Sequence, residues 1–240
     1  MNAQSEVEVK AATNIERGQS GFVNAVRVHN ALTARLEKRL LMWMAARIPA
    51  AISPDHLTAL ALGGQVFAGV AYALSSWDGR LLWLVNCFLF VNWLGDSLDG
   101  TLARVRNQQR PRYGFYVDHV ADTFGALALM FGLGCSGYLH WEIAAGMLVG
   151  FYALAIESYL ATYTTGRFHL SHGIFGPTEI RILLVGGNIL IGIHPYVNFV
   201  GRRFLSFDVG GAVAISGMAV MVLSAAVRQT VLLYKEEALP

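Results

Sequence analysis

The chain has 240 residues, of which 55% are hydrophobic and only 14% are charged. Charged residues make up about 25% of ordinary soluble domains, so this composition excludes a soluble globular protein and indicates a membrane protein. The formal net charge is only +2, and no basic cluster accompanies a nucleic-acid-binding motif. We therefore exclude a nucleic-acid partner.

The first 51 residues differ in composition from the rest of the chain. Residues 1–21 are polar and poor in aromatic side chains, which predicts a disordered cytoplasmic tail. Residues 22–51 carry apolar side chains at helical spacing: Val28, Leu32, Leu36, Leu40 and Met44. This pattern predicts an amphipathic helix that lies in the membrane interface. A helix that packs on a partner domain is the alternative.

The remaining residues, 52–240, contain six long apolar stretches. They cover residues 57–77, 81–105, 115–139, 143–164, 180–200 and 209–233. Each approaches or exceeds the roughly 20 residues that span a bilayer. We therefore expect an all-α integral membrane protein, in which a six-helix domain follows the amphipathic helix. Cys87 and Cys135 fall within these stretches, and we expect both to be buried small hydrophobic residues.

The basic residues predict an orientation. If both termini are cytoplasmic, 15 of the 18 Lys and Arg residues lie on the cytoplasmic side, and only Arg80, Arg202 and Arg203 lie outside. This distribution obeys the positive-inside rule. The membrane would be the cell inner membrane if the protein is bacterial.

Four aspartates lie inside the second and third apolar stretches. They belong to the array Asp96-x2-Asp99-Gly100-x2-Ala103-Arg104-x9-Gly114-x3-Asp118-x3-Asp122. A carboxylate at bilayer depth is disfavoured by roughly 2.5 kcal/mol or more, so four of them require compensation. The spacing places them on single faces of two helices. Hard oxygen ligands of this kind suit Mg²⁺ or Mn²⁺, and interhelical salt bridges or helix caps are the alternative.

Small residues accompany the aspartates. Gly100 and Ala103 lie one turn apart, which lets a pyrophosphate or base approach the backbone closely. Arg104 follows on the same helix, and a guanidinium pairs with phosphate in a bidentate way. The sequence therefore indicates a site near the cytoplasmic face that accepts a phosphorylated ligand.

The run from Asp96 to Asp122 resembles the signature of the CDP-alcohol phosphotransferase family at all eight signature positions. The resemblance implies a six-helix membrane core, a homodimer, and transfer of a phosphoalcohol group from a CDP-alcohol to a second alcohol with release of CMP. One of the two partners would be a lipid.

The resemblance also implies roles for single residues. Asp96, Asp99 and Asp118 would hold one divalent metal, and Asp96, Asp118 and Asp122 a second one. Gly100, Ala103, Arg104 and Gly114 would receive the cytidine diphosphate. At the start of the first span the family often has Pro-Asn-x-Leu-Thr, whereas this chain has Asp55 in place of Asn. We interpret Asp55 and Thr58 as helix-capping residues.

A general base must take the proton of the acceptor hydroxyl. The family resemblance implies Asp122 for this role. His119 is the rival candidate, because the choline- and ethanolamine-phosphotransferase branch carries Asp-His at this point. A histidine packed between helices is the alternative for His119.

Two further segments resemble the same branch. They are the Glu157-x-Tyr159 pair and the run Gly176-Pro177-Thr178-Glu179. Glu157 and Glu179 would balance the ammonium group of an aminoalcohol. Alternatively, Glu179 caps a helix and pairs with Arg181 or Arg167.

Three functions remain as hypotheses. The preferred one is a transferase that uses a CDP-aminoalcohol and diacylglycerol. The second uses CDP-diacylglycerol and a small polar alcohol such as glycerol phosphate, inositol phosphate or serine. The third, from another class, is a cation transporter that uses the intramembrane aspartates.

Overall fold

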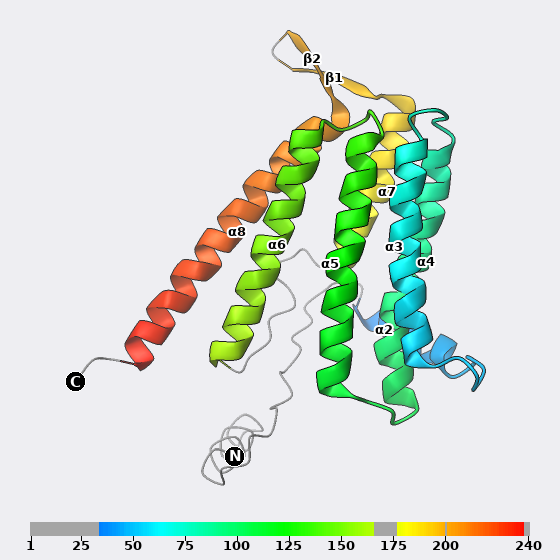
Figure 1. Ribbon diagram of the computed structural model, residues 1–240, viewed down its shortest axis with the longest axis vertical. Coiled ribbons are helices and arrows are strands. Elements are labelled where there is room, and N and C mark those ends of the chain that lie inside the picture. The colour runs from blue at the N-terminus through cyan, green and yellow to red at the C-terminus, as the bar shows by residue number, and fades with distance from the viewer. Residues whose placement is uncertain (1–33, 166–176, 200, 238–240) are drawn as a thin grey trace.

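The computed structural model describes residues 34–165, 177–199 and 201–237. Within these ranges the chain forms seven helices and one two-stranded hairpin (Figure 1). In chain order the elements are α2 (Ala34–Ala45), α3 (Pro54–Leu74), α4 (Leu81–Val105), α5 (Pro111–Cys135), α6 (Trp141–Thr165), α7 (Pro177–Ile193), β1 (Tyr196–Phe199), β2 (Arg202–Leu205) and α8 (Ser206–Glu236).

Four of the described helices are long and apolar enough to cross a membrane: α3, α4, α6 and α8. Helix α5 has 25 residues, but Asp118, His119 and Asp122 lower the hydropathy of its first half. Helix α7 has only 17 residues. The predicted helical membrane architecture is therefore confirmed, while the number of six spans stays a prediction.

The two-stranded hairpin is a local departure from a predominantly helical structure. The fifth apolar stretch was expected to continue to residue 200, but α7 ends at Ile193 and is followed by β1 and β2, which pair antiparallel. Proline has no amide hydrogen and disfavours a helical residue before it, so Pro195 stops the helix. Gly201 then adopts a φ of 73°, a conformation that glycine tolerates without strain.

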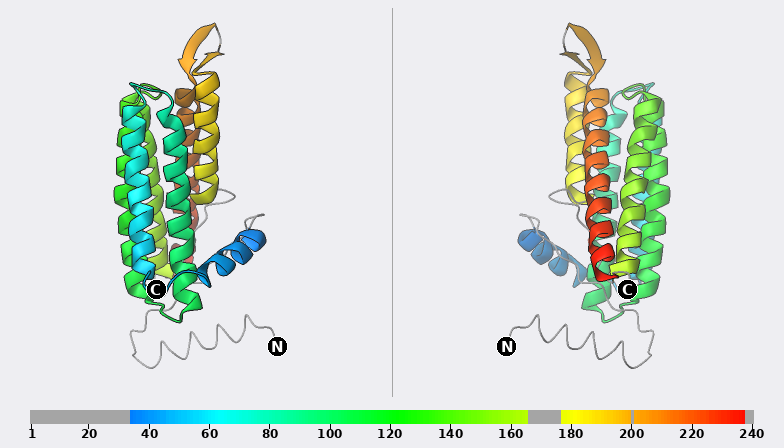
Figure 2. Two further views of the ribbon diagram at one scale, coloured as in Figure 1. Left: turned by 90° about the vertical axis from the view of Figure 1, so that its right-hand side faces the viewer. Right: turned by 90° about the vertical axis from the view of Figure 1, so that its left-hand side faces the viewer.

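Helices α3 to α8 alternate in direction, which places the loop between α4 and α5 and the β-hairpin at opposite ends of the bundle (Figures 1 and 2). We call these the loop end and the hairpin end. Trp77, Trp83 and Trp141 are exposed at the hairpin ends of α3, α4 and α6. Exposed tryptophans at one level are typical of a membrane–water interface.

Helix α3 packs against both α4 and α5, and glycine makes both contacts possible. A Cβ atom at Gly95 would lie 2.6 Å from the carbonyl oxygen of Leu57. A Cβ atom at Gly132 would overlap the carbonyl group of Gly69. Close backbone approach through small residues is a common way for membrane helices to associate. Helix α3 thus becomes the shared support of α4 and α5.

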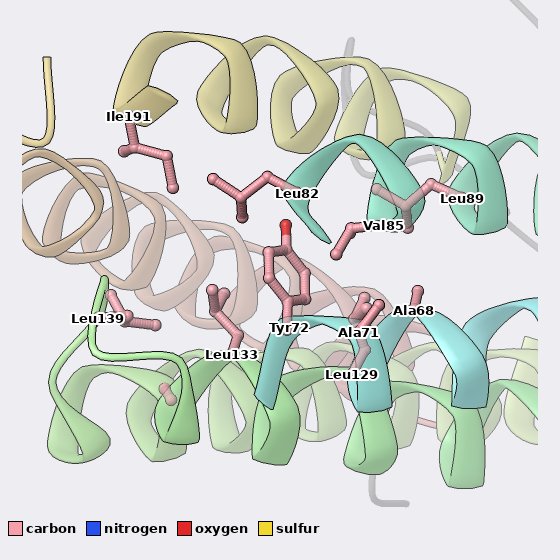
Figure 3. Close-up of a cluster of buried hydrophobic side chains, with 11 residues drawn as sticks. Ala68, Ala71, Tyr72, Leu82, Val85, Leu89, Leu129, Leu133, Leu139 and Ile191 are labelled. Carbon is pink, nitrogen blue, oxygen red and sulfur yellow. The ribbon is translucent and has the colours of Figure 1, made fainter. Parts of the chain in front are cut away.

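The core between α3, α4, α5 and α7 lies nearer the hairpin end and contains Tyr72, Leu89 and Leu133 (Figure 3). The hydroxyl of Tyr72 donates to Oδ1 of Asn188 at 2.7 Å. The amide of Asn188 donates in turn to Asn86 at 2.7 Å. The Tyr72 hydroxyl and the Asn188 amide are therefore both hydrogen-bonded, and α7 is tied to α3 and α4.

Helix α2 lies at the loop end, where Leu41 and Ala45 pack on α3 and α4. Of the segment 22–51 that was expected to form the amphipathic helix, residues 34–51 are described, and the helix covers Ala34–Ala45 of them. Arg106 donates to the carbonyl oxygens of Ile48 and Ile52, which fixes the turn that leads into α3. The expectation for the two cysteines was wrong, because Cys87 and Cys135 are both exposed on the helix surface.

Candidate active site

The aspartates of α4 lie one turn apart and make different contacts. Asp96 faces α7, where its Oδ2 atom accepts a hydrogen bond from Nη2 of Arg181 at 2.7 Å. The Arg181 side chain is 13% exposed and the Asp96 side chain 26%. This ion pair is therefore shielded from water, and its strength exceeds that of a surface pair.

Arg181 is held at a second point. Its Nε donates to Oδ1 of Asn92 at 2.7 Å, and Asn92 is only 3% exposed. The amide nitrogen of Asn92 donates to the carbonyl oxygen of Ala61 at 2.9 Å and more weakly to Gln65 at 3.4 Å. Helices α3, α4 and α7 thus meet in one polar network directly beside Asp96.

Asp99 faces α3. Its Oδ2 accepts from the hydroxyl of Thr58 at 2.7 Å, and its Oδ1 accepts from the backbone nitrogen of Gly100 at 2.5 Å. Thr58 lies in the first turns of α3, which Ser53 and His56 start with a reciprocal capping box. Thr58 was interpreted as a cap, but its hydroxyl is used to hold Asp99.

Two carboxylates come from α5. Asp122 interacts electrostatically with Asp96 and Asp99 and with Arg181, so the acidic groups of α4 and α5 face one region of the bundle. Asp118 and Asp122 both interact with Tyr159 on α6. Helices α4 and α5 both pack on α3, and the presentation of their aspartates to one cavity stays a prediction.

His119 is packed among aromatic rings. Its Nδ1 lies 2.6 Å from the carbonyl oxygen of Phe115. Its ring lies edge-on to Tyr159, with centroids 5.0 Å apart, and 4.1 Å from the ring of Phe115. A carbonyl partner requires a proton on Nδ1, so Nε2 is the nitrogen that accepts protons. This packing matches the alternative considered for His119, and the role of base stays a prediction.

The residues expected to receive the nucleotide lie toward the loop end. Nη2 of Arg104 donates a hydrogen bond to the hydroxyl oxygen of Thr101 at 3.1 Å. A Cβ atom at Gly100 would lie 3.5 Å from Nη1 of the same arginine. Gly114 has open space around it, and Ala103 is half-buried. Gly100 and Arg104 are therefore neighbours on the surface of α4, whereas Gly114 lies on α5.

Glu157 and Glu179, the glutamates expected to balance an ammonium group, lie on different helices. Glu157 is half-buried on α6, two residues before Tyr159. Glu179 lies in the first turn of α7, and its side chain is outside the described residues. In the loop between α4 and α5, Arg110 forms an ion pair with Asp55, in which its Nη2 atom donates to both carboxylate oxygens. That contact raises the pKa of Arg110 and gives Asp55 a partner that the sequence did not indicate.

A cavity of about 340 Å³ opens at this loop, lined by Ser53, Pro54, Gln108, Gln109 and Arg110. It lies between the start of α3 and the loop that follows α4. It does not include any of the four aspartates.

The donor set can be compared with the needs of a metal. Carboxylate oxygens are the ligands that Mg²⁺ and Mn²⁺ prefer. In the described part of the chain, however, no three His, Cys, Asp or Glu side chains form a group that could hold a metal ion. Arg181 engages Asp96, and Thr58 and Gly100 engage Asp99. The carboxylate oxygens are ligands of the kind that a divalent cation prefers, but in this structure those of Asp96 and Asp99 bind groups of the protein itself.

Sequence reasoning missed three residues of this region: Asn92, Thr58 and Arg181. Asn92 and Arg181 had a usable signal, since polar residues inside apolar helices mark functional sites. Arg181 had been considered as a cytoplasmic charge and as a possible partner of Glu179, not as a partner of Asp96. Thr58 had no such signal, because a threonine near a helix start is common.

Comparison with known proteins supports the resemblance. The family profile described as CDP-alcohol phosphatidyltransferase matches residues 51–227. Over 140 residues the chain is 26% identical to archaetidylinositol phosphate synthase of Pyrococcus horikoshii, which covers 58% of this chain and 66% of that protein. Over 88 residues it is 31% identical to phosphatidylinositol phosphate synthase of Cutibacterium acnes, which covers 37% of this chain and 40% of that protein. In both matches the chain spans less than two thirds of the relative.

Proposed function

We propose that this chain, which belongs to the CDP-alcohol phosphatidyltransferase family, transfers a phosphatidyl-type group from a CDP-linked lipid to a small polar alcohol and releases CMP. The names of the two relatives describe inositol phosphate lipid synthases. They fit the second hypothesis from the sequence, CDP-diacylglycerol with a small polar alcohol, better than the CDP-aminoalcohol reaction. We therefore take inositol phosphate as the first acceptor to test.

The observation that supports the proposal is that the two acidic helices, α4 and α5, pack on the same helix, α3. Asp122 of α5 interacts electrostatically with Asp96 and Asp99 of α4. Like charges at this depth repel each other and are costly to bury. Carboxylates that stay close together despite this cost therefore indicate a functional role for the negative charge. Cleavage of a pyrophosphate is such a role, because it proceeds through positioning and charge neutralisation.

The proposed cofactors are two Mg²⁺ or Mn²⁺ ions, held by Asp96, Asp99, Asp118 and Asp122. When bound, they would offset the negative charge of the pyrophosphate oxygens. The cytidine diphosphate would lie along Gly100, Ala103, Arg104 and Gly114. The absence of side chains at the glycines allows close approach of the phosphates, and Arg104 supplies a guanidinium for one of them.

In the proposed reaction the acceptor oxygen attacks the phosphorus that carries the lipid. The bond from that phosphorus to the bridging oxygen breaks, and CMP leaves with the bonding electrons. Asp122 takes the proton of the acceptor hydroxyl. His119 is the second candidate for this step, because its Nε2 is the basic nitrogen when Nδ1 is bonded to Phe115.

The same proposal includes the setting of the enzyme. Helices α5 and α7 would complete six spans with α3, α4, α6 and α8. The loop end, both termini and the aspartates would face the cytoplasm, where a small polar acceptor is dissolved. The assembly would be a homodimer in a lipid membrane.

The decisive experiment follows CMP release by the purified protein in lipid nanodiscs with Mg²⁺ or Mn²⁺. One series supplies CDP-diacylglycerol with inositol phosphate, glycerol phosphate or serine, and the other supplies CDP-choline or CDP-ethanolamine with diacylglycerol. We expect CMP only in the first series, most rapidly with inositol phosphate. CMP only in the second series would overturn the proposed substrates, and metal uptake into proteoliposomes without CMP would favour a transporter.

A further inference from the structure

Arg181 is a cation built into the acidic region. It comes from α7, whereas the aspartates come from α4 and α5, and it interacts with groups on both of those helices. Its side chain is the less exposed partner of the pair with Asp96. A largely shielded guanidinium is stable only where acceptors satisfy it, and Asp96 and Asn92 supply them.

The position of this guanidinium conflicts with a metal on the same carboxylate. Nη2 of Arg181 lies 2.7 Å from Oδ2 of Asp96. A Mg²⁺ ion bound to a carboxylate oxygen lies at about 2.0–2.1 Å. Two cations on one oxygen, in a region shielded from water, repel each other strongly. At Oδ2 of Asp96, a bound metal and the contact with Arg181 would therefore compete.

Asn92 could hold the Arg181 side chain while its contact with Asp96 is replaced by a metal. The bond from Nε of Arg181 to Asn92 is independent of the bond from Nη2 to Asp96. Asn92 is itself fixed by Ala61 on α3. A rotation of the Arg181 side chain that keeps the bond from Nε to Asn92 would take Nη2 away from Asp96.

We propose that Arg181 is an internal counter-ion for Asp96 that a divalent cation displaces, so that the site exchanges its own cation for the metal. This inference rests on the proposed function, since it takes Asp96 as a metal ligand. It explains why the donor chemistry fits a metal while no group of three ligands is assembled within the described residues. Without metal, the pair with Arg181 holds Asp96 in place.

The first test measures Mn²⁺ binding by electron paramagnetic resonance, without substrate. In Arg181→Gln the metal no longer competes with the guanidinium, and the loss of one shielded ion pair corresponds to binding about tenfold tighter. Arg112→Gln is the matched control, since Arg112 is an exposed arginine at the loop end of α5. We expect the control to bind like the wild type.

The outcomes separate the two proposals. Equal affinity in Arg181→Gln and wild type would overturn the counter-ion role and leave the metal site standing. Equal tightening in Arg112→Gln would also overturn it, because general charge would then be the cause. Absence of Mn²⁺ binding in the wild type would overturn this inference and the proposed cofactors together.

A second test needs no variant and stays valid if Arg181→Gln fails to fold. The wild-type protein is treated with phenylglyoxal, which modifies arginine, and the modified positions are mapped by mass spectrometry. We expect Mg²⁺ alone to increase modification of Arg181 several-fold and to leave that of Arg112 unchanged. Unchanged or reduced modification of Arg181 at saturating Mg²⁺ would contradict the displacement.

Discussion

The hydroxyl of Thr58 on α3 donates a 2.7 Å hydrogen bond to Oδ2 of Asp99 on α4, across 41 positions of sequence. Together with the backbone nitrogen of Gly100, it satisfies both oxygens of this carboxylate. A carboxylate with two donors has a fixed orientation, and residues that orient metal ligands are important for activity.

We therefore predict that Thr58→Val lowers the rate of CMP release. A hydrogen bond to a charged group contributes about 1.5–3 kcal/mol, and partial exposure reduces this, so the expected loss is roughly tenfold. Thr58→Ser keeps the hydroxyl and should recover most of the rate. Wild-type kinetics in the valine variant would mean that Thr58 does not position Asp99.

The second prediction concerns Asp118, which is expected to serve both metals. Asp118→Asn should reduce turnover by more than the roughly 10–100-fold typical of a residue that only supports a ligand. Steady-state kinetics measure the loss, and circular dichroism in detergent checks that the helices remain. Asp78→Asn is the control, because Asp78 lies at the hairpin end and should keep full activity. Substantial turnover in Asp118→Asn would contradict the shared ligand.

The third prediction concerns pH and the hairpin end. His140 donates its backbone nitrogen to Asp208 at 2.9 Å, and its Nδ1 lies 2.5 Å from the same carboxylate. The side-chain hydrogen bond and then the charge of Asp208 raise the pKa of His140 above its ordinary value of 6.5. This contact ties the loop before α6 to the first turn of α8.

A raised pKa in the folded state means that the stabilisation is complete below pH 6.5 and is lost as the pH rises through the folded pKa. The difference in melting temperature between wild type and His140→Gln should therefore be largest in acid and shrink in mildly alkaline buffer. Thermal unfolding over this pH range measures it. A difference that is constant with pH would mean that the charge of His140 does not contribute.

The fourth prediction concerns the contact between α3 and α5. Gly132→Ala places a methyl group against the backbone of Gly69, and overpacking of this kind costs about 1–3 kcal/mol. Gly63→Ala is the matched control, because no atom lies within 4 Å of the added methyl group. Alanine has the better helix propensity, so the control should be neutral or stabilised by up to about 1 kcal/mol. Equal free energies of unfolding for the two variants would contradict the close approach of the α3 and α5 backbones at Gly69 and Gly132.

Much of the membrane architecture follows from local sequence. The predicted second stretch, 81–105, coincides with α4, and the predicted ends of the other long helices differ from the observed ends by a few residues. Apolar length and helical periodicity are local properties, so they are readable without the fold. The hairpin was missed because β1, Tyr196–Phe199, continues the apolar stretch of α7 in the sequence, and Pro195 was not taken as a stop.

The sequence by itself determined that the chain enters a membrane and that Asp96, Asp99, Asp118 and Asp122 lie on helix faces, because spacing along one helix fixes direction. Only the tertiary structure decided which side chains meet them. Arg181 reaches Asp96 across 85 positions, and this contact depends on how α7 packs beside α4. Packing of distant helices is set by the whole set of contacts between them, which no single segment contains.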